Sequence, residues 1–213
     1  MDSESTVFVI DDDASIRESV TALARLKGLK AEAFATAEDF LAQYDAKRKG
    51  CLVVDVRMPG MSGVELLQTL KARGSLLPAV VITGFADVPT AVRAMQEGAV
   101  TLLEKPTQQD DLWQAIKRAL DLEQSQHAKR KYRADADARM ASLNDDELEI
   151  LRRLLAGHSN KQIALDLDLG LRTVELRRSN IMKKMQAVNL PDLVRMAVIT
   201  GFFKPEGYEE RRL

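Results

Sequence analysis

VFVIDDD (Val7–Asp13) and CLVVDVRMPGMSG (Cys51–Gly63) are the two stretches that decide the fold of the first half of the chain. In both, a run of apolar and mostly β-branched residues passes directly into acidic residues, as a buried strand does when it ends at a polar edge. Three further strand-like runs alternate with amphipathic helical stretches: KAEAF (Lys30–Phe34), AVVIT (Ala79–Thr83) and TLLE (Thr101–Glu104). This alternation predicts an α/β fold, a doubly wound five-stranded parallel sheet in the order 2-1-3-4-5 with helices on both faces.

The stretches between the strands carry start and stop signals for helices. Ser62 with Glu65 predicts a capping box. Further N-cap candidates are Thr36, Asp87 and Thr107. Glycines stand where three helices should end, at Gly28, Gly74 and Gly98.

The second half of the chain shows no strand pattern. Four helical segments are predicted near residues 145–155, 160–166, 171–185 and 191–199, which makes this half an all-α four-helix domain. Ser159 with Gln162 predicts a capping box, and a turn ending at Gly170 leads into a helix from Arg172 to Met185. Two helices joined in this way form a helix-turn-helix.

A charged stretch, Gln124–Met140, separates the two halves and has a helical pattern with few large apolar residues. It is typical of a solvated helical linker or of a helix that faces a partner protein. We therefore predict one domain over residues 1–122, a helical linker over 123–141 and a second domain over 142–213.

The composition is that of an ordinary soluble protein, with 46% hydrophobic and 30% charged residues. No apolar run approaches the ~18 residues of a membrane helix, and the acidic N-terminus does not resemble a secretory signal, so we expect a cytoplasmic protein with no membrane partner. A single cysteine, Cys51, gives no intrachain disulfide and, with two histidines, no zinc site.

The charge is distributed unevenly along the chain. Residues 1–124 carry 14 basic and 19 acidic side chains, whereas residues 125–213 carry 17 basic and 13 acidic side chains. Only the charge of the second half therefore favours binding to a polyanion.

Polar residues gather at the carboxyl ends of the predicted strands, the edge where ligands bind in this class of sheet. They are Asp11, Asp12, Asp55, Thr83 and Lys105. Each acid alone is explained by a solvated surface role, but several carboxylates at one edge repel one another unless a hard cation such as Mg²⁺ neutralises them. An aspartate beside such a cation suits nucleophilic attack on a phosphoryl group, whose oxygens the ammonium of Lys105 and the hydroxyl of Thr83 would stabilise.

Four motifs in this order, VIDDD, VVDVRMPGMSG, VITG and EKP, closely resemble those of the receiver domain of bacterial two-component response regulators. The resemblance covers about residues 5–122. It implies a flavodoxin-like fold in which Asp55 accepts a phosphoryl group from a phosphohistidine of a sensor histidine kinase. The implied roles of the other residues are Mg²⁺ binding by Asp11, Asp12, Asp55 and the backbone carbonyl of Arg57, and contact with the phosphoryl oxygens by Thr83 and Lys105. It also implies a cis peptide bond at Lys105–Pro106. Where the family often has an aromatic switch residue this chain has Leu102, and the sequence leaves its role open.

A phosphohydrolase is the enzyme alternative, because enzymes that resemble the haloacid dehalogenases also use an aspartate nucleophile at a strand end. Those enzymes carry a second aspartate two residues later as the general acid, and here that position is Arg57. Without an acid for the leaving group, we expect a phosphorylated signalling protein and not an enzyme.

The helix from Arg172 to Met185 has a polar face suited to DNA. Setting successive residues 100° apart places Val174, Ile181 and Met185 toward the core. The opposite face consists of Arg172, Glu175, Leu176, Ser179 and Lys183, whose side chains can read base edges in a major groove. Arg177 and Arg178 flank this face. The residues at helix N-termini, where phosphates are favoured, are Asn160, Lys161 and Thr173. A merely solvated charged face is the alternative, and the capped helix and turn before it argue against that alternative.

The segment GHSNKQIALDLDLGLRTVELRRSNIMKKM (Gly157–Met185) resembles the DNA-binding domain of LuxR-type regulators, and its pairing with the first domain matches the NarL/FixJ subfamily. This resemblance implies binding to double-stranded DNA by a homodimer that forms on phosphorylation through the last helix, Pro191–Ile199, at half-sites related by twofold symmetry. Two departures are Gly170 in place of a usual Ser cap and Asp146 in place of a frequent Arg.

Together these observations and resemblances predict a transcriptional response regulator in which phosphorylation controls dimerisation and DNA binding. The alternative is a receiver-containing regulator that acts mainly through protein contacts, with little DNA binding.

Overall fold

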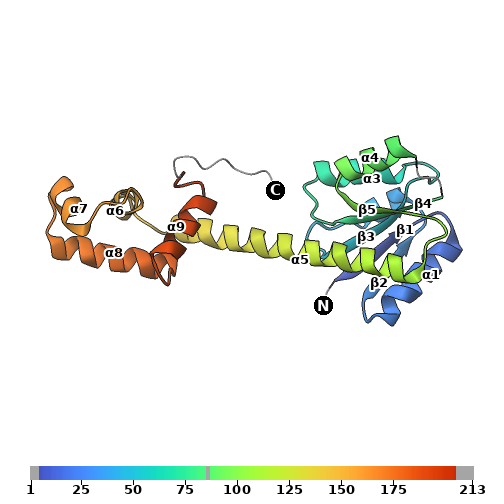
Figure 1. Ribbon diagram of the computed structural model, residues 1–213, viewed down its shortest axis with the longest axis horizontal. Coiled ribbons are helices and arrows are strands. Elements are labelled where there is room, and N and C mark those ends of the chain that lie inside the picture. The colour runs from blue at the N-terminus through green and yellow to red at the C-terminus, as the bar shows by residue number, and fades with distance from the viewer. Residues whose placement is uncertain (1–4, 85–86, 205–213) are drawn as a thin grey trace. The chain divides into compact units, whose positions relative to one another are not determined.

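The chain divides into two compact units, Met1–His127 and Ala128–Leu213. The computed structural model describes residues 5–84 and 87–204 (Figure 1). The first unit contains the sheet, and the second is helical. None of the helices in the described ranges is long and apolar enough to cross a membrane.

Five parallel strands form one sheet in the order β2-β1-β3-β4-β5, as predicted. The strands are β1 (Thr6–Ile10), β2 (Lys30–Phe34), β3 (Gly50–Asp55), β4 (Ala79–Thr83) and β5 (Ala99–Glu104). β5 begins at Ala99 and not at the predicted Thr101, because a register shift between Ala79 and Val80 allows Ala99 to pair with β4.

Helices cover both faces of the sheet. They are α1 (Ala14–Leu26), α2 (Ala37–Ala42), α3 (Gly63–Ala72), α4 (Val88–Gln96) and α5 (Gln109–Met140). Because successive side chains of a strand point to opposite faces, β1 contributes to two separate cores. Phe8 and Ile10 pack with residues of α2, α3 and α4, while Val7 and Val9 pack with residues of α1 and α5. Figure 1 shows α3 and α4 on one side of the sheet and α1 and α5 on the other.

Most of the predicted helix ends are confirmed, and one is wrong. Ser62 and Glu65 form the capping box at the start of α3. The wrong one is Thr107: α5 begins at Gln109, and the Thr107 hydroxyl donates to the carbonyl oxygen of Glu104 at 3.0 Å. The observed N-caps are Thr36 and Asp87, and the glycines with positive φ beyond the helix ends are Gly28, Gly74 and Gly98.

The second unit consists of α6 (Asp145–Leu155), α7 (Asn160–Asp166), α8 (Leu171–Met185) and α9 (Leu190–Ile199), joined by the last part of α5. Val174, Ile181 and Met185 are fully buried in its core, as the helical spacing predicts. Ala136 of α5 is buried in the same core. The stretch 123–141 is therefore helical but not wholly solvated, and the domain limits that we expect remain a prediction.

The capping box predicted at the start of α7 is only half formed. The backbone N–H of Gln162 donates to Ser159 Oγ at 3.2 Å. The Gln162 side chain instead donates to Asp166 Oδ1 at 2.7 Å, because this carboxylate lies one helical turn further along α7. Gly170 precedes α8 without a side-chain cap.

Candidate functional sites

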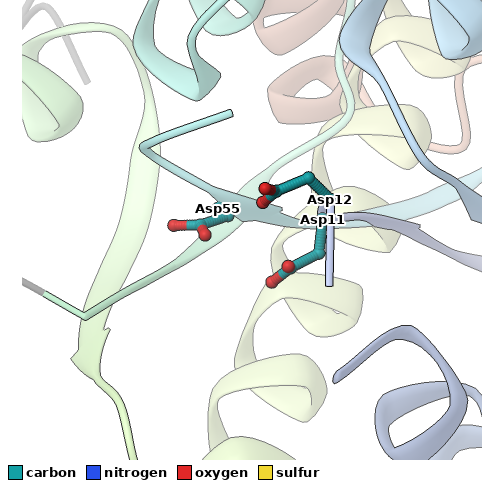
Figure 2. Close-up of side chains that lie close together, drawn as sticks. All are labelled: Asp11, Asp12 and Asp55. Carbon is teal, nitrogen blue, oxygen red and sulfur yellow. The ribbon is translucent and has the colours of Figure 1, made fainter. Parts of the chain in front are cut away.

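Three carboxylates lie together where β1 and β3 end. Asp11 and Asp12 follow β1, and Asp55 is the last residue of β3, which pairs directly with β1. A ligand oxygen from each lies within 4.8 Å of the others, and Figure 2 shows the three side chains close together. Asp11 and Asp55 are buried, whereas Asp12 is exposed. We call these three residues the acidic cluster.

Lys105 contacts two members of the acidic cluster from the end of β5. Its Nζ donates to Asp11 Oδ2 at 2.7 Å and to Asp55 Oδ2 at 2.8 Å. Its backbone N–H donates to the Thr83 carbonyl oxygen at 2.8 Å, which holds the ends of β4 and β5 together. The Lys105–Pro106 peptide bond is cis, as the resemblance implies.

The electrostatics of the cluster favour a cation. Burial raises the pKa of the Asp11 carboxyl, and the hydrogen bond from Lys105 offsets this only in part. Burial also works against the charge of Lys105, but its hydrogen bonds to Asp11 and Asp55 outweigh burial and raise the pKa of its ammonium. One ammonium thus faces three carboxylates, which leaves negative charge for an oxygen-preferring cation to neutralise.

The remaining predicted residues of this site lie at the same edge of the sheet. The Arg57 backbone N–H donates to Asp55 Oδ1 at 3.3 Å, so its backbone lies beside the carboxylate. Thr83 is fully buried at the end of β4, the strand between β3 and β5. Leu102 of β5 is half-buried and packs against the core on the α3 and α4 side.

The loop after Asp55 is held by contacts that the sequence did not reveal. Glu38 Oε1, on α2, accepts from the Met61 backbone N–H at 2.9 Å. At Gly63 any side chain would clash, because a Cβ there would lie 2.1 Å from the Asp55 carbonyl oxygen. Arg17 Nη1 donates to the Asp11 carbonyl oxygen at 2.6 Å. Met61 and Gly63 lie in the motif VVDVRMPGMSG, but no motif marks Glu38 or Arg17.

The candidate nucleic-acid interface lies on α7 and α8 of the second unit. The five residues expected to read bases are all exposed: Arg172, Glu175, Leu176, Ser179 and Lys183. Of the residues expected at helix N-termini, Lys161 and Thr173 are exposed and Asn160 is half-buried. The face opposite the buried Val174 is therefore open to solvent.

Arg177 and Arg178, on the flanks of this face, contact different helices. Arg177 Nη1 lies 2.8 Å from Asp146 Oδ2 on α6. Arg178 Nη1 donates to Asn160 Oδ1 at the start of α7, at 3.0 Å. The sequence marked Asp146 only as a departure from the LuxR-type pattern and gave no sign of this ion pair.

Glu147 joins α6 to α8 from a buried position. It forms a capping box with Asn144, and its Oε2 lies 2.6 Å from Lys184 Nζ. Burial works against its charge, but the hydrogen bonds from Lys184 and from the Asn144 backbone outweigh burial and lower the pKa of the Glu147 carboxyl. α8 is therefore attached to α6 by a charge pair in which Glu147 is buried and Lys184 is partly exposed.

Comparison with protein families matches each half of the chain. Residues 7–117 match the response regulator receiver domain, and residues 141–197 match the bacterial regulatory proteins of the LuxR family.

Curated proteins match over nearly their whole length. The transcriptional regulatory protein FixJ of Azorhizobium caulinodans is 43% identical over 92% of this chain and 92% of its own. The response regulator protein TodT of Pseudomonas putida is 38% identical over 92% of this chain and 86% of its own.

Solved structures match over both halves of the chain as well. The response regulator StyR has a TM-score of 0.83 and 39% identity, covering 92% of this chain and 98% of its own. Full-length FixJ from B. japonicum has a TM-score of 0.58 and 41% identity, covering 95% of this chain and 100% of its own.

Proposed function

The chain belongs to the NarL/FixJ subfamily of transcriptional response regulators, which join a receiver domain to a LuxR-type DNA-binding domain. We propose which of its residues accept the phosphoryl group, hold Mg²⁺ and contact DNA. Its partners are a sensor histidine kinase and double-stranded DNA. We place the domain limits at 1–122 and 142–213, with 123–141 as the linker, and the protein in the cytoplasm, where its DNA target would lie.

In our proposal Asp55 is the phosphoacceptor. A carboxylate oxygen of Asp55 attacks the phosphorus of a kinase phosphohistidine, forming an acyl phosphate O–P bond. The N–P bond breaks, and its electron pair stays on the imidazole nitrogen. The observation that carries this assignment is the contact of Asp55 with Lys105, whose ammonium lies 2.8 Å from the Asp55 carboxylate. From this position the ammonium can stabilise the negative charge on the oxygens of the transferring phosphoryl group.

Asp11, Asp12, Asp55 and the Arg57 carbonyl would hold Mg²⁺, because the cluster offers hard oxygen donors and excess negative charge. When bound, Mg²⁺ supplies neutralisation of the charge on the transferring phosphoryl group. The Thr83 hydroxyl would donate a hydrogen bond to a phosphoryl oxygen. Arg57 stands where a general acid would be needed for hydrolysis of phosphate esters, so we propose no enzymatic turnover of such substrates.

In the second domain, we assign base reading to the exposed face of α8 and backbone contact to its flanks and to helix N-termini. The base-reading residues would be Arg172, Glu175, Leu176, Ser179 and Lys183. The phosphate-contacting residues would be Asn160, Lys161, Thr173, Arg177 and Arg178. A homodimer formed through α9 would place two such helices on half-sites with approximate twofold symmetry.

The experiment that tests this function is selection of bound duplexes from a random pool, using the full chain with and without acetyl phosphate. We expect one enriched motif with two symmetric halves, recovered more strongly from the phosphorylated protein. Recovery of random sequences only, in both conditions, would reject base reading by α8.

A further inference from the structure

Asp146 and Arg177 form an ion pair at the surface of the second unit. The Asp146 side chain is 65% exposed and that of Arg177 is 31% exposed, so solvent ions reach both groups. A pair of this kind is weak, and salt screens it. A competing anion can therefore displace Asp146 from Arg177.

The ion pair lies beside the exposed face of α8. Arg177 directly follows Leu176, a residue of that face that is 63% exposed. Lys184, two helical turns further along the same side, is already held by Glu147. Two carboxylates from the first turn of α6 are thus paired with the two cationic side chains on this side of α8.

The other side of α8 is different. Arg178 donates to Asn160 Oδ1, which is a neutral amide oxygen. Its positive charge is not cancelled by this contact, whereas the charge of Arg177 is cancelled by Asp146. The two arginines therefore differ in the charge that they present to a phosphate.

We propose that Asp146 competes with a DNA phosphate for Arg177 and thereby lowers the general affinity of the protein for DNA. This inference rests on the proposed function, in which Arg177 contacts the backbone. A phosphate that approaches Arg177 must displace the Asp146 carboxylate and then lie near its negative charge. Because phosphate contacts carry no sequence information, the effect applies equally to preferred and random DNA.

The test measures anisotropy of labelled random-sequence and selected duplexes with the full chain over a series of salt concentrations. Asp146→Asn removes the charge and keeps the shape. We expect it to tighten binding to both duplexes about three- to tenfold at low salt and to steepen the dependence of log affinity on log salt by ~1.

Two controls separate competition for Arg177 from a general change of charge. Asp145→Asn makes the same change in the same turn of α6, at an exposed acid for which no ion pair occurs among the described residues, and should have a much smaller effect. In an Arg177→Ala background, Asp146→Asn should lose most of its effect. If Asp146→Asn does not fold, Asp146→Ser should give the same tightening.

Equal effects of Asp145→Asn and Asp146→Asn, no tightening by Asp146→Asn, or full tightening in the Arg177→Ala background would overturn the inference. In these cases the protein still binds DNA. Absence of DNA binding by the unaltered chain would instead reject the proposed function.

Discussion

Lys105 Nζ lies 2.8 Å from Asp55 Oδ2, although the two residues are 50 positions apart in the chain. The contact exists because β3 and β5 flank β4 in a parallel sheet, so that their carboxyl ends meet at one edge. It places an ammonium on the carboxylate that we propose as the phosphoacceptor. The same edge of the sheet holds Asp11 and Asp12, which with Asp55 form the acidic cluster that we propose as the Mg²⁺ site.

Replacing Asp12 by Asn should weaken Mg²⁺ binding about tenfold or more, because an amide oxygen is a poorer ligand for a hard cation than a carboxylate. Calorimetric titration of the full chain with MgCl₂ measures the change. Asp13→Asn is the matched control, since Asp13 caps α1 through the Ser15 N–H and lies outside the cluster. Equal affinities for the two variants would rule out Asp12 as a ligand.

The affinity for Mg²⁺ should fall on acidification earlier than an ordinary aspartate site would allow. Burial raises the pKa of Asp11, so protons compete with the metal at a pH above the usual value of about 3.9. The expected result is a loss of affinity that begins above that value and that Asp11→Asn makes less steep. A titration series with constant affinity down to pH 4 would contradict it.

Much of this site was predictable because it depends on strand ends. In β1 the alternation of Val7 and Val9 with Phe8 and Ile10 assigns the two faces, and the acids that follow must lie at the edge. The contacts of Glu38 with the Met61 backbone and of Asp146 with Arg177 were not predictable, because each joins residues that are far apart in the sequence and meet only in the folded chain.

Two local predictions failed for a different reason, competition between neighbouring partners. The Thr107 hydroxyl donates to the Glu104 carbonyl oxygen instead of capping α5, and the Gln162 side chain donates to Asp166 instead of accepting from the Ser159 backbone N–H. Polar side chains near a helix start have several hydrogen-bond partners within reach, and the sequence does not show which partner is preferred.

Glu147→Gln should destabilise the second unit by ~1–3 kcal/mol at neutral pH, because it leaves Lys184 without its charged partner. The pKa of Glu147 is lowered in the folded state, so its contribution is present above the unfolded value of about 4.3 and is lost as the pH falls through the lower folded value. The variant should therefore show a flatter pH dependence of stability in that range.

Urea unfolding of the full chain, followed by circular dichroism, measures this difference. The single tryptophan, Trp113, belongs to the first unit, so its fluorescence serves as an internal control that should not change. Parallel pH curves for the variant and the unaltered chain would contradict the role of the Glu147 charge.

Substitution of the base-reading residues of α8 should affect DNA binding differently from substitution of the backbone-contacting residues. Glu175→Ala or Ser179→Ala should cost ~1–3 kcal/mol on the selected site and little on random DNA. Arg178→Ala should weaken binding to both and reduce the salt dependence by ~1 per lost phosphate contact. Competition binding with both duplexes tests this. Equal losses for Glu175→Ala on specific and random DNA would mean that this helix does not read bases.

The most direct test of the central claim, that phosphorylation of Asp55 governs DNA binding, is the affinity of the full chain for its selected duplex with and without acetyl phosphate and Mg²⁺. The unaltered chain should bind roughly 5–150-fold more tightly after phosphorylation, and Asp55→Asn should show no gain because an amide cannot form the acyl phosphate. A gain that persists in Asp55→Asn, or no gain in a fully phosphorylated unaltered chain, would contradict the account.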